Sequence, residues 1–286
     1  MKKAYLIIII SLFANVVFAQ IPVATKKQIN DFYKTTTLVV KDDGVFSEFN
    51  SEIESVMKKY WTATPYKFIT YSELEGYMRK PEYSFIMKTR IRYEAKNVTD
   101  VEYNFLTLVM GYGSAENVTN LPDLCSFPLS YDKGDADKYM FKLPSAIQFM
   151  QKHVELTRTD ESLNTDNIIK YYNKNKTAFN DKTLWLLKED LSPDVNSLAK
   201  IQKVYPGKVE IVDAETLTEA INEQKKGIVY LHKVGPTMKS AKARCWKLIL
   251  STSDATLYYF DFHKITSKDP DGILEADFKS FKRMNN

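Results

Sequence analysis

The chain has 286 residues, of which 44% are hydrophobic, 13% are aromatic and 27% are charged, and its formal net charge is +4. This length is sufficient for two compact domains, each with its own apolar core. A charge balance so close to neutrality gives no basis for binding nucleic acid or a strongly anionic surface.

The first nineteen residues predict a secretory signal peptide. Lys2 and Lys3 precede the apolar run Ala4–Phe18, and a small residue, Ala19, stands at the expected cleavage site. The run is shorter than the roughly 20 residues that a membrane-spanning helix needs, which argues against the competing interpretation as an anchor. No cysteine follows the cleavage site, so we expect no lipid anchor. The mature chain is predicted to be an exported soluble protein, periplasmic or secreted, with a net charge of +2 once both lysines are removed.

Residues 20–140 are predicted to form a first α/β unit. A short buried strand at Leu38–Val40 is followed by an amphipathic helix that ends at Tyr60. After Pro65 comes a strand at Tyr66–Ile69, and Thr70 then caps a short helix. The remaining elements are two strands that form a hairpin, Tyr83–Tyr93 and Val101–Met110 with a turn at Lys96–Asp100, and a looser stretch with room for one more short strand.

A helical connector, residues 141–182, separates this unit from a second one at 183–286. Pro144 suits the first turn of the connector helix, and we expect the boundary near Thr159. The second unit is predicted to contain strands at Leu184–Leu187, Val209–Val212, Ile228–His232, Cys245–Leu250 and Leu257–His263, helices marked by Val195 to Tyr205 and by Thr216–Lys225, and a closing helix at Leu274 to Phe281. The last three strands would form an antiparallel meander.

The two units look like copies of one another. Tyr66–Met87 and Val209–Tyr230 both contain an apolar pair, a capping residue, a short helix and a second apolar run. A single offset of 143 residues relates Phe68 to Ile211 and holds throughout this stretch. The element order agrees upstream and downstream as well, which favours tandem duplication over chance similarity. The predicted fold class is therefore α/β with some α+β character: two pseudo-equivalent β-α-β-α-β-β domains with mixed sheets.

Each half resembles the α/β domain shared by the TolB N-terminal region, CsgG and related envelope lipoproteins. The residues that carry the resemblance are the strand ends Phe68-Ile69-Thr70 and Ile211-Val212-Asp213, and the short helices that contain Leu74 and Leu217. The resemblance implies docking or assembly rather than catalysis, although the absent anchor cysteine departs from CsgG. A thioredoxin-like core is the competing assignment. Its C-x-x-C motif is absent, which argues against redox activity and leaves the fold open.

Three groups of residues could carry chemistry. The first is His232, Cys245 and His263, which strand register could bring to one sheet edge as metal ligands or an activated nucleophile. The register that we expect places His232 on the same face as Cys245, and His263 opposite Arg244 on the other face. Ordinary residues at strand ends explain the same pattern without a site.

The second group is a pair of carboxylates after the first strand of each half, Asp42-Asp43 and Glu189-Asp190. Ligands of α/β sheets favour the carboxyl ends of the strands, so these pairs could hold calcium or magnesium. Turn residues and acids at helix starts explain them equally well.

The third group is the basic stretch at 233–247, which comprises Lys233, Lys239, Lys242, Arg244 and Lys247 beside Trp246. It could touch a polyanion, or it could be a solvated turn that guards a sheet edge. Cys125 and Cys245 are the only thiols, and two separate buried thiols are favoured over a disulfide.

The motifs of common enzyme classes are absent. The sequence lacks G-x-S-x-G, H-E-x-x-H and glycine-rich nucleotide-binding patterns, and its three histidines include His153 on an apolar helix face. We therefore predict no catalytic, cofactor-binding or metal residues and no cofactor. The expected function is non-catalytic binding of another envelope protein or a scaffold role. The alternative is an enzyme or metal-binding protein that uses His232/Cys245/His263 or the strand-end carboxylates.

Overall fold

The computed structural model describes residues 22–44, 47–92, 102–131, 137–236 and 243–282. The predicted signal peptide, the hairpin turn at 96–100, and Lys239 and Lys242 lie outside these ranges. The elements of the first half are α1 (Lys26–Phe32), β1 (Thr36–Lys41), α2 (Glu48–Tyr60), β2 (Tyr66–Thr70), α3 (Tyr71–Leu74), β3 (Tyr83–Arg92), β4 (Glu102–Met110) and β5 (Asp123–Tyr131). Between the halves lie α4 (Asp137–Met140), α5 (Leu143–Thr159) and α6 (Ile168–Asn173). The second half contains β6 (Thr183–Leu187), α7 (Leu198–Val204), β7 (Lys208–Val212), α8 (Ala214–Asn222), β8 (Ile228–Val234), β9 (Arg244–Ser251), β10 (Leu257–Lys264) and α9 (Glu275–Ser280).

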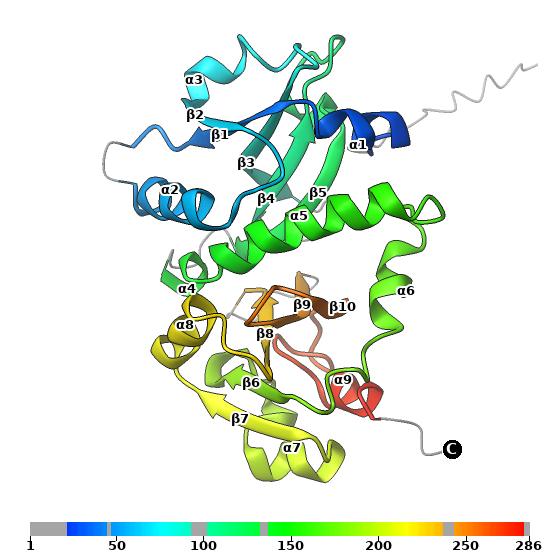
Figure 1. The fold of residues 1–286 in the computed structure, drawn as a ribbon. Coiled ribbons are helices and arrows are strands. Elements are labelled where there is room, and N and C mark those ends of the chain that lie inside the picture. Colours follow the sequence, from blue (N-terminus) through cyan, green and yellow to red (C-terminus); the bar gives the residue numbers. More distant parts are fainter. Residues whose placement is uncertain (1–21, 45–46, 93–101, 132–136, 237–242, 283–286) are drawn as a thin grey trace, which may run out of the picture.

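The two halves contain five-stranded sheets with corresponding strand orders. The first sheet has the order β2-β1-β3-β4-β5, and the second has the order β7-β6-β8-β9-β10 (Figure 1). In the first sheet, β1 pairs in parallel with β2 and β3, and β4 is antiparallel to β3 and β5. In the second sheet, β6 pairs in parallel with β7 and β8, and β9 is antiparallel to β8 and β10. The predicted α/β class with two similar mixed-sheet halves is confirmed.

Local sequence signals explain where several elements begin. Along α2, the buried residues Phe49, Ile53, Val56 and Met57 lie on one helical face, as the spacing predicts. At the start of α3, the Thr70 backbone N–H donates to the Glu73 carboxylate at 2.7 Å. The Asp213 side chain accepts from the Thr216 N–H at 2.8 Å and caps α8.

Two elements differ from the prediction. The stretch expected to hold one short strand contains β5, nine residues long and paired with β4. In the second half, Val195 lies in a 3-10 turn, and α7 begins only at Leu198 because Ser197 caps its start by accepting from the Lys200 N–H. Leu198 is consequently exposed instead of facing the core.

Strand pairing also corrects the alignment of the repeat. Tyr66 lies opposite Thr37, and its repeat equivalent Val209 lies opposite Leu184, so Thr36 of β1 corresponds to Thr183 of β6. Thr36 lies opposite Tyr83, whereas Thr183 lies opposite Ile228. The third strands therefore correspond with an offset of 145 residues (Tyr83 to Ile228) instead of 143. A shift of two residues leaves every side chain on its original face of the sheet. The longer helix α8, which replaces the one-turn α3, accounts for the added length.

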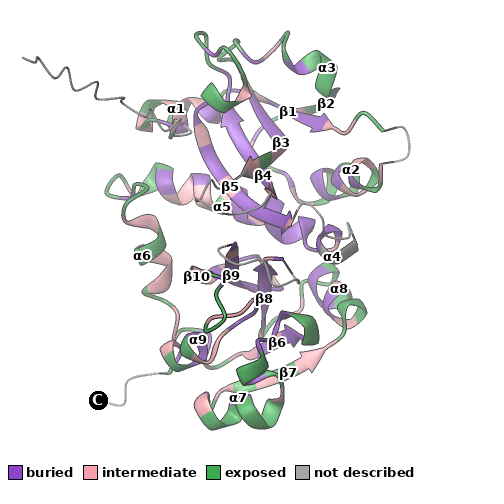
Figure 2. Ribbon diagram, turned by 180° about the vertical axis from the view of Figure 1, so that it is seen from behind, coloured by how far each residue is buried: buried purple, intermediate pink, exposed green. Residues whose placement is uncertain are grey.

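Helix α5 lies in the interior between the halves. Ile147, Met150 and Val154 are fully buried, and one apolar cluster includes α5 with residues of both sheets. Figure 1 shows α5 crossing between the two sheets, and Figure 2 shows the strands largely buried and the outer helices α3 and α7 mainly exposed. Within the described residues, no helix is both long and apolar enough to cross a membrane.

The halves present opposite faces to this shared core. The first sheet contributes the face that carries α2, represented by Ile53. The second contributes the face that carries α8, represented by Leu217, while its α7 face packs separately with α9 through Tyr205 and Phe278. Equivalent faces therefore have different surroundings, so equivalent residues of the two halves cannot be assumed to play equivalent parts.

A shared core predicts that the two halves unfold together. Two variants test this: one keeps only Trp61, in the first half, and the other keeps only Trp185, in the second, with the remaining tryptophans replaced by Phe. The denaturation midpoints measured by tryptophan fluorescence of the two variants should coincide. Ile147→Ala should destabilise both by about 2–5 kcal/mol, because it opens a cavity in the common interior. Two separated transitions, or a shift confined to one tryptophan, would contradict this expectation.

Candidate functional site

The structure brings two residues of the predicted His/Cys group together and places the third on the other face of the sheet. Cys245 lies directly opposite His263 across β9 and β10, so the expected pairing of His263 with Arg244 is wrong. His232 lies opposite Leu248, on the other face of the sheet. A shift of one residue in strand pairing moves a side chain to the other face of the sheet, and the sequence does not specify the pairing to within one residue.

His232 joins the two halves. It is buried, its ring stacks on Phe127 with centroids 4.9 Å apart, and its Nε2 lies 2.7 Å from the Pro128 carbonyl oxygen of β5. Burial, with a smaller contribution from the Lys142 ammonium, lowers the pKa of His232 to about 3. The ring is therefore neutral at pH 7, with Nε2–H as the donor.

This lowered pKa predicts acid sensitivity. Because the unfolded imidazole titrates near 6.5, the unfolded state gains a proton first as pH falls below that value, and the folded state loses stability until about pH 3. Between pH 6 and 4, His232→Gln should show a pH dependence of the unfolding free energy shallower than wild type by about 1.4 kcal/mol per pH unit.

Urea titrations at several pH values would measure this difference. Lys208→Gln at an exposed strand position is the control and should leave the slope unchanged. A His232→Gln slope equal to that of wild type would show that the histidine keeps an ordinary pKa in the fold.

The two remaining imidazoles are also engaged by the protein. His263 Nε2 lies 2.9 Å from the Pro270 carbonyl oxygen, and burial lowers the pKa of this histidine. His153 Nδ1 lies 2.9 Å from the Tyr172 hydroxyl, and burial lowers its pKa to about 4. All three histidines are neutral near pH 7.

The cysteines are two separate buried thiols, as favoured from the sequence. Cys245 Sγ accepts from the Gly272 N–H at 3.5 Å, and burial raises its pKa. Burial also raises the pKa of Cys125 far above its ordinary value. Both side chains are protonated at neutral pH, whereas a nucleophile or metal ligand needs the thiolate.

The carboxylates after β1 and β6 meet different environments. Asp42 is partly exposed, and its Oδ2 lies 2.5 Å from the Lys88 ammonium. Asp190 is buried, and Glu189 is exposed. Burial raises the pKa of Asp190, although the Lys142 and Lys233 ammonium groups oppose the rise. Among the described residues, no group of three His, Cys, Asp or Glu side chains is arranged to hold a metal ion.

The basic stretch is not a uniform solvated surface. Lys233 and Lys247 are buried on one face of the sheet, where Lys233 pairs with Asp271. Lys247 donates to both oxygens of Asp277 at 2.6 and 2.7 Å. The expectation that these two lysines line a solvated turn is wrong, because acids from the C-terminal segment fold over them.

Together, these charges form what we call the strand-end ionic cluster, which consists of Lys142, Asp190, Lys233, Lys247, Asp271 and Asp277. It surrounds the carboxyl ends of β6 and β8, where ligands of α/β sheets usually bind. Here the chain's own segment around 271–281 occupies that position, anchored by a bridge between Leu191 and Ile273. The cluster fastens this segment to the sheet.

Sequence reasoning missed part of this arrangement. Lys142 stands at the N-cap of α5, where the helix dipole disfavours a cation, and the nearby Asp190 offsets this cost. Lys88 and Lys233 occupy corresponding positions of β3 and β8 once the offset of 145 is applied, and each faces an acid. A lysine within an otherwise apolar strand was the available signal, since such a residue needs a buried partner.

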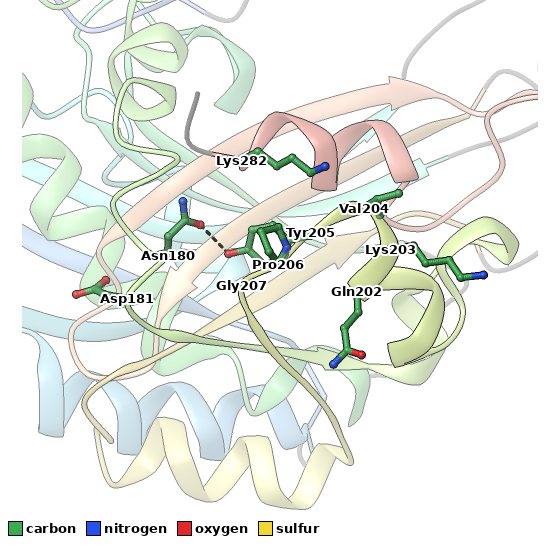
Figure 3. Close-up of a pocket in the computed structure, with 9 residues that line it drawn as sticks. All are labelled: Asn180, Asp181, Gln202, Lys203, Val204, Tyr205, Pro206, Gly207 and Lys282. Carbon is green, nitrogen blue, oxygen red and sulfur yellow. Dashed lines mark hydrogen bonds between the residues drawn. The ribbon is translucent and has the colours of Figure 1, made fainter. Parts of the chain in front are cut away.

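A separate depression of about 540 Å³ lies beside Tyr205 (Figure 3). The Tyr205 hydroxyl donates to Asn180 Oδ1 at 2.7 Å, and its ring lies so close to Gly207 that an added Cβ would come within 2.3 Å of ring atoms. Lys203, Lys282 and Asp181 line its rim. The tyrosine is held by packing and a hydrogen bond, an arrangement that supports the turn at Pro206-Gly207.

Comparison with known proteins found no matching family model, no matching curated protein and no matching solved structure.

Proposed function

We propose that this protein is an exported, non-catalytic binding or scaffold module whose partner is another envelope protein. The observation that carries the proposal is the strand-end ionic cluster, where the chain's own C-terminal segment fills the usual ligand position. The histidines and thiols support it, because the lowered pKa values of His232 and His263 make their imidazoles weak bases and the buried Cys245 thiol stays protonated at pH 7.

We also propose that the halves arose by tandem duplication of one domain of the type that resembles the TolB N-terminal and CsgG-like envelope domains. The corresponding strand orders and the shared placement of Lys88 and Lys233 support this origin. Cleavage after Ala19 completes the proposal and accounts for export. The N-terminal mass of protein recovered from the cell envelope tests that step directly.

In-cell cross-linking of the tagged chain, followed by mass spectrometry of the recovered complex, tests the binding function. We expect one envelope protein in near-stoichiometric amount. Neutralising Lys239 and Lys242 measures the contribution of the basic stretch. A stoichiometric transition metal in the purified protein that is lost in His232→Ala would instead favour the enzyme or metal-binding alternative.

A further inference from the structure

Residues 22–33, which we call the N-terminal clasp, attach to the end of α5 and to β5. Within the clasp, α1 buries Ile29 and Phe32 in the apolar core. The Lys26 ammonium donates to three carbonyl oxygens at the end of α5 and in the turn after it, those of Thr157, Asp160 and Leu163, at 2.8, 3.2 and 3.1 Å. The carbonyl end of a helix attracts a cation, and backbone carbonyls do not titrate, so this contact holds the clasp at both acidic and neutral pH.

The second attachment of the clasp is to Asp123, the first residue of β5. The Asp123 N–H donates to the Pro22 carbonyl at 2.7 Å, and the Ala24 N–H donates to the Asp123 carbonyl at 2.9 Å. The two chains run parallel at this bridge. Because the main chain of Asp123 carries both bonds, its side chain lies at the junction between the clasp and β5.

The Asp123 carboxyl is only partly satisfied at this junction. Its Oδ2 accepts from the Ser126 hydroxyl at 3.0 Å, and the Cys125 N–H bonds to the same side chain. Its Oδ1 is shielded from water, and within the described chain no donor lies at hydrogen-bond distance from it. A buried carboxylate oxygen without a donor disfavours the charged form. Burial accordingly raises the pKa of Asp123 to about 6, although the bonds from Ser126 and Cys125 oppose the rise.

The groups around Asp123 keep one charge state between pH 5 and pH 8. Val109 lies opposite Asp123 on β4. On β5, burial raises the pKa of the Cys125 thiol far above its ordinary value, so the thiol stays protonated. Burial also raises the pKa of Tyr172 of α6, which lies near that thiol. In the clasp, the Lys26 ammonium is directed at the carbonyls of α5. The change of charge at this junction is therefore that of Asp123.

We propose that Asp123 makes the N-terminal clasp a pH-sensitive fastening, held firmly on β5 at mildly acidic pH and released more readily near neutral pH. In the fastened state the carboxyl is buried at the junction, and release of the clasp exposes it to water. The exposed carboxyl has an ordinary pKa of 3.8, so between that value and about 6 the released state gives up a proton that the fastened state keeps. The stability of the fastened state is therefore greatest below pH 3.8 and falls as the pH rises to about 6.

Hydrogen exchange of the mature chain, followed by NMR, measures this release at the bonded amides of Ala24 and Ile29. After correction for intrinsic exchange rates, the equilibrium constant for release should be about tenfold larger at pH 8 than at pH 5. Asp123→Asn keeps a neutral side chain at every pH and should remove this difference. Asp31→Asn is the matched control. Hydrogen bonds from two nearby lysines lower the pKa of this exposed acid of α1, so it is ionised throughout, and its loss should leave the tenfold ratio unchanged.

A direct titration keeps the test valid if Asp123→Asn does not fold. The carbon chemical shift of the Asp123 carboxyl in the wild-type chain should change with a midpoint near pH 6. A midpoint near the ordinary value, equal release at pH 5 and pH 8, or a tenfold ratio that persists in Asp123→Asn would overturn the inference. Release of the clasp that is as rare as opening of the core strand β8 would overturn it too, because the clasp would then separate only when the whole fold opens.

Discussion

Lys247→Ala is expected to lower the free energy of unfolding by about 3–5 kcal/mol. The Lys247 ammonium and the Asp277 carboxylate are both buried, and Asp277 also accepts from the Tyr259 hydroxyl and the Leu274 N–H. Truncating the lysine leaves a buried carboxylate without its counter-ion, and the cost of that desolvated charge exceeds the value of the pair itself. Guanidinium denaturation, followed by circular dichroism, measures the loss.

A double variant tests the cause. Lys247→Met together with Asp277→Leu removes both charges and should recover most of the stability, because no unpaired charge remains. Lys279→Ala removes an exposed lysine of the same helix that carries Asp277 and should cost less than about 1 kcal/mol. A single Lys247→Ala variant that loses no more than this control would show that the pair is hydrated in solution.

Gly272→Ala should destabilise the protein by about 3 kcal/mol or more. Gly272 has a φ of +115°, and an added Cβ would lie 2.6 Å from the Ser192 nitrogen and 2.8 Å from the Leu191 carbonyl carbon. Both contacts are with backbone, so no side-chain rotation relieves them. The variant should also loosen the segment that carries Asp271, which faster hydrogen exchange over residues 266–281 would detect.

Gly227→Ala is the matched control. Gly227 also has a positive φ, +78°, but nothing lies within 4 Å of its added Cβ. Its cost should therefore be the backbone term alone, about 1–2 kcal/mol. Equal losses in the two variants would contradict close packing of Gly272 against the Leu191–Ser192 backbone.

The candidate site was only partly predictable from the sequence. Hydrophobic periodicity placed the acids Asp42 and Asp190 after the first strand of each half, and in the structure both lie near lysine side chains. The sequence could not show that Asp271 and Asp277 return to neutralise Lys233 and Lys247, because these pairs join residues 38 and 30 positions apart through the tertiary fold. Nor could it separate His232 from Cys245, since a one-residue change in strand register moves a side chain to the other face.

The sequence by itself determined the α/β class, the order of the elements from β1 to β4 and from β6 to β10, the capped starts of α3 and α8, and the preference for separate thiols. These follow from local periodicity, caps and turn residues, which act within a few positions of the chain. Only the tertiary structure decided that α5 lies in a core shared by both halves and that the two sheets use opposite faces to build that core. These features depend on which surfaces, far apart in the chain, pack against one another. Similar hydrophobic patterns in the two halves allow either face of a sheet to be the one that is packed.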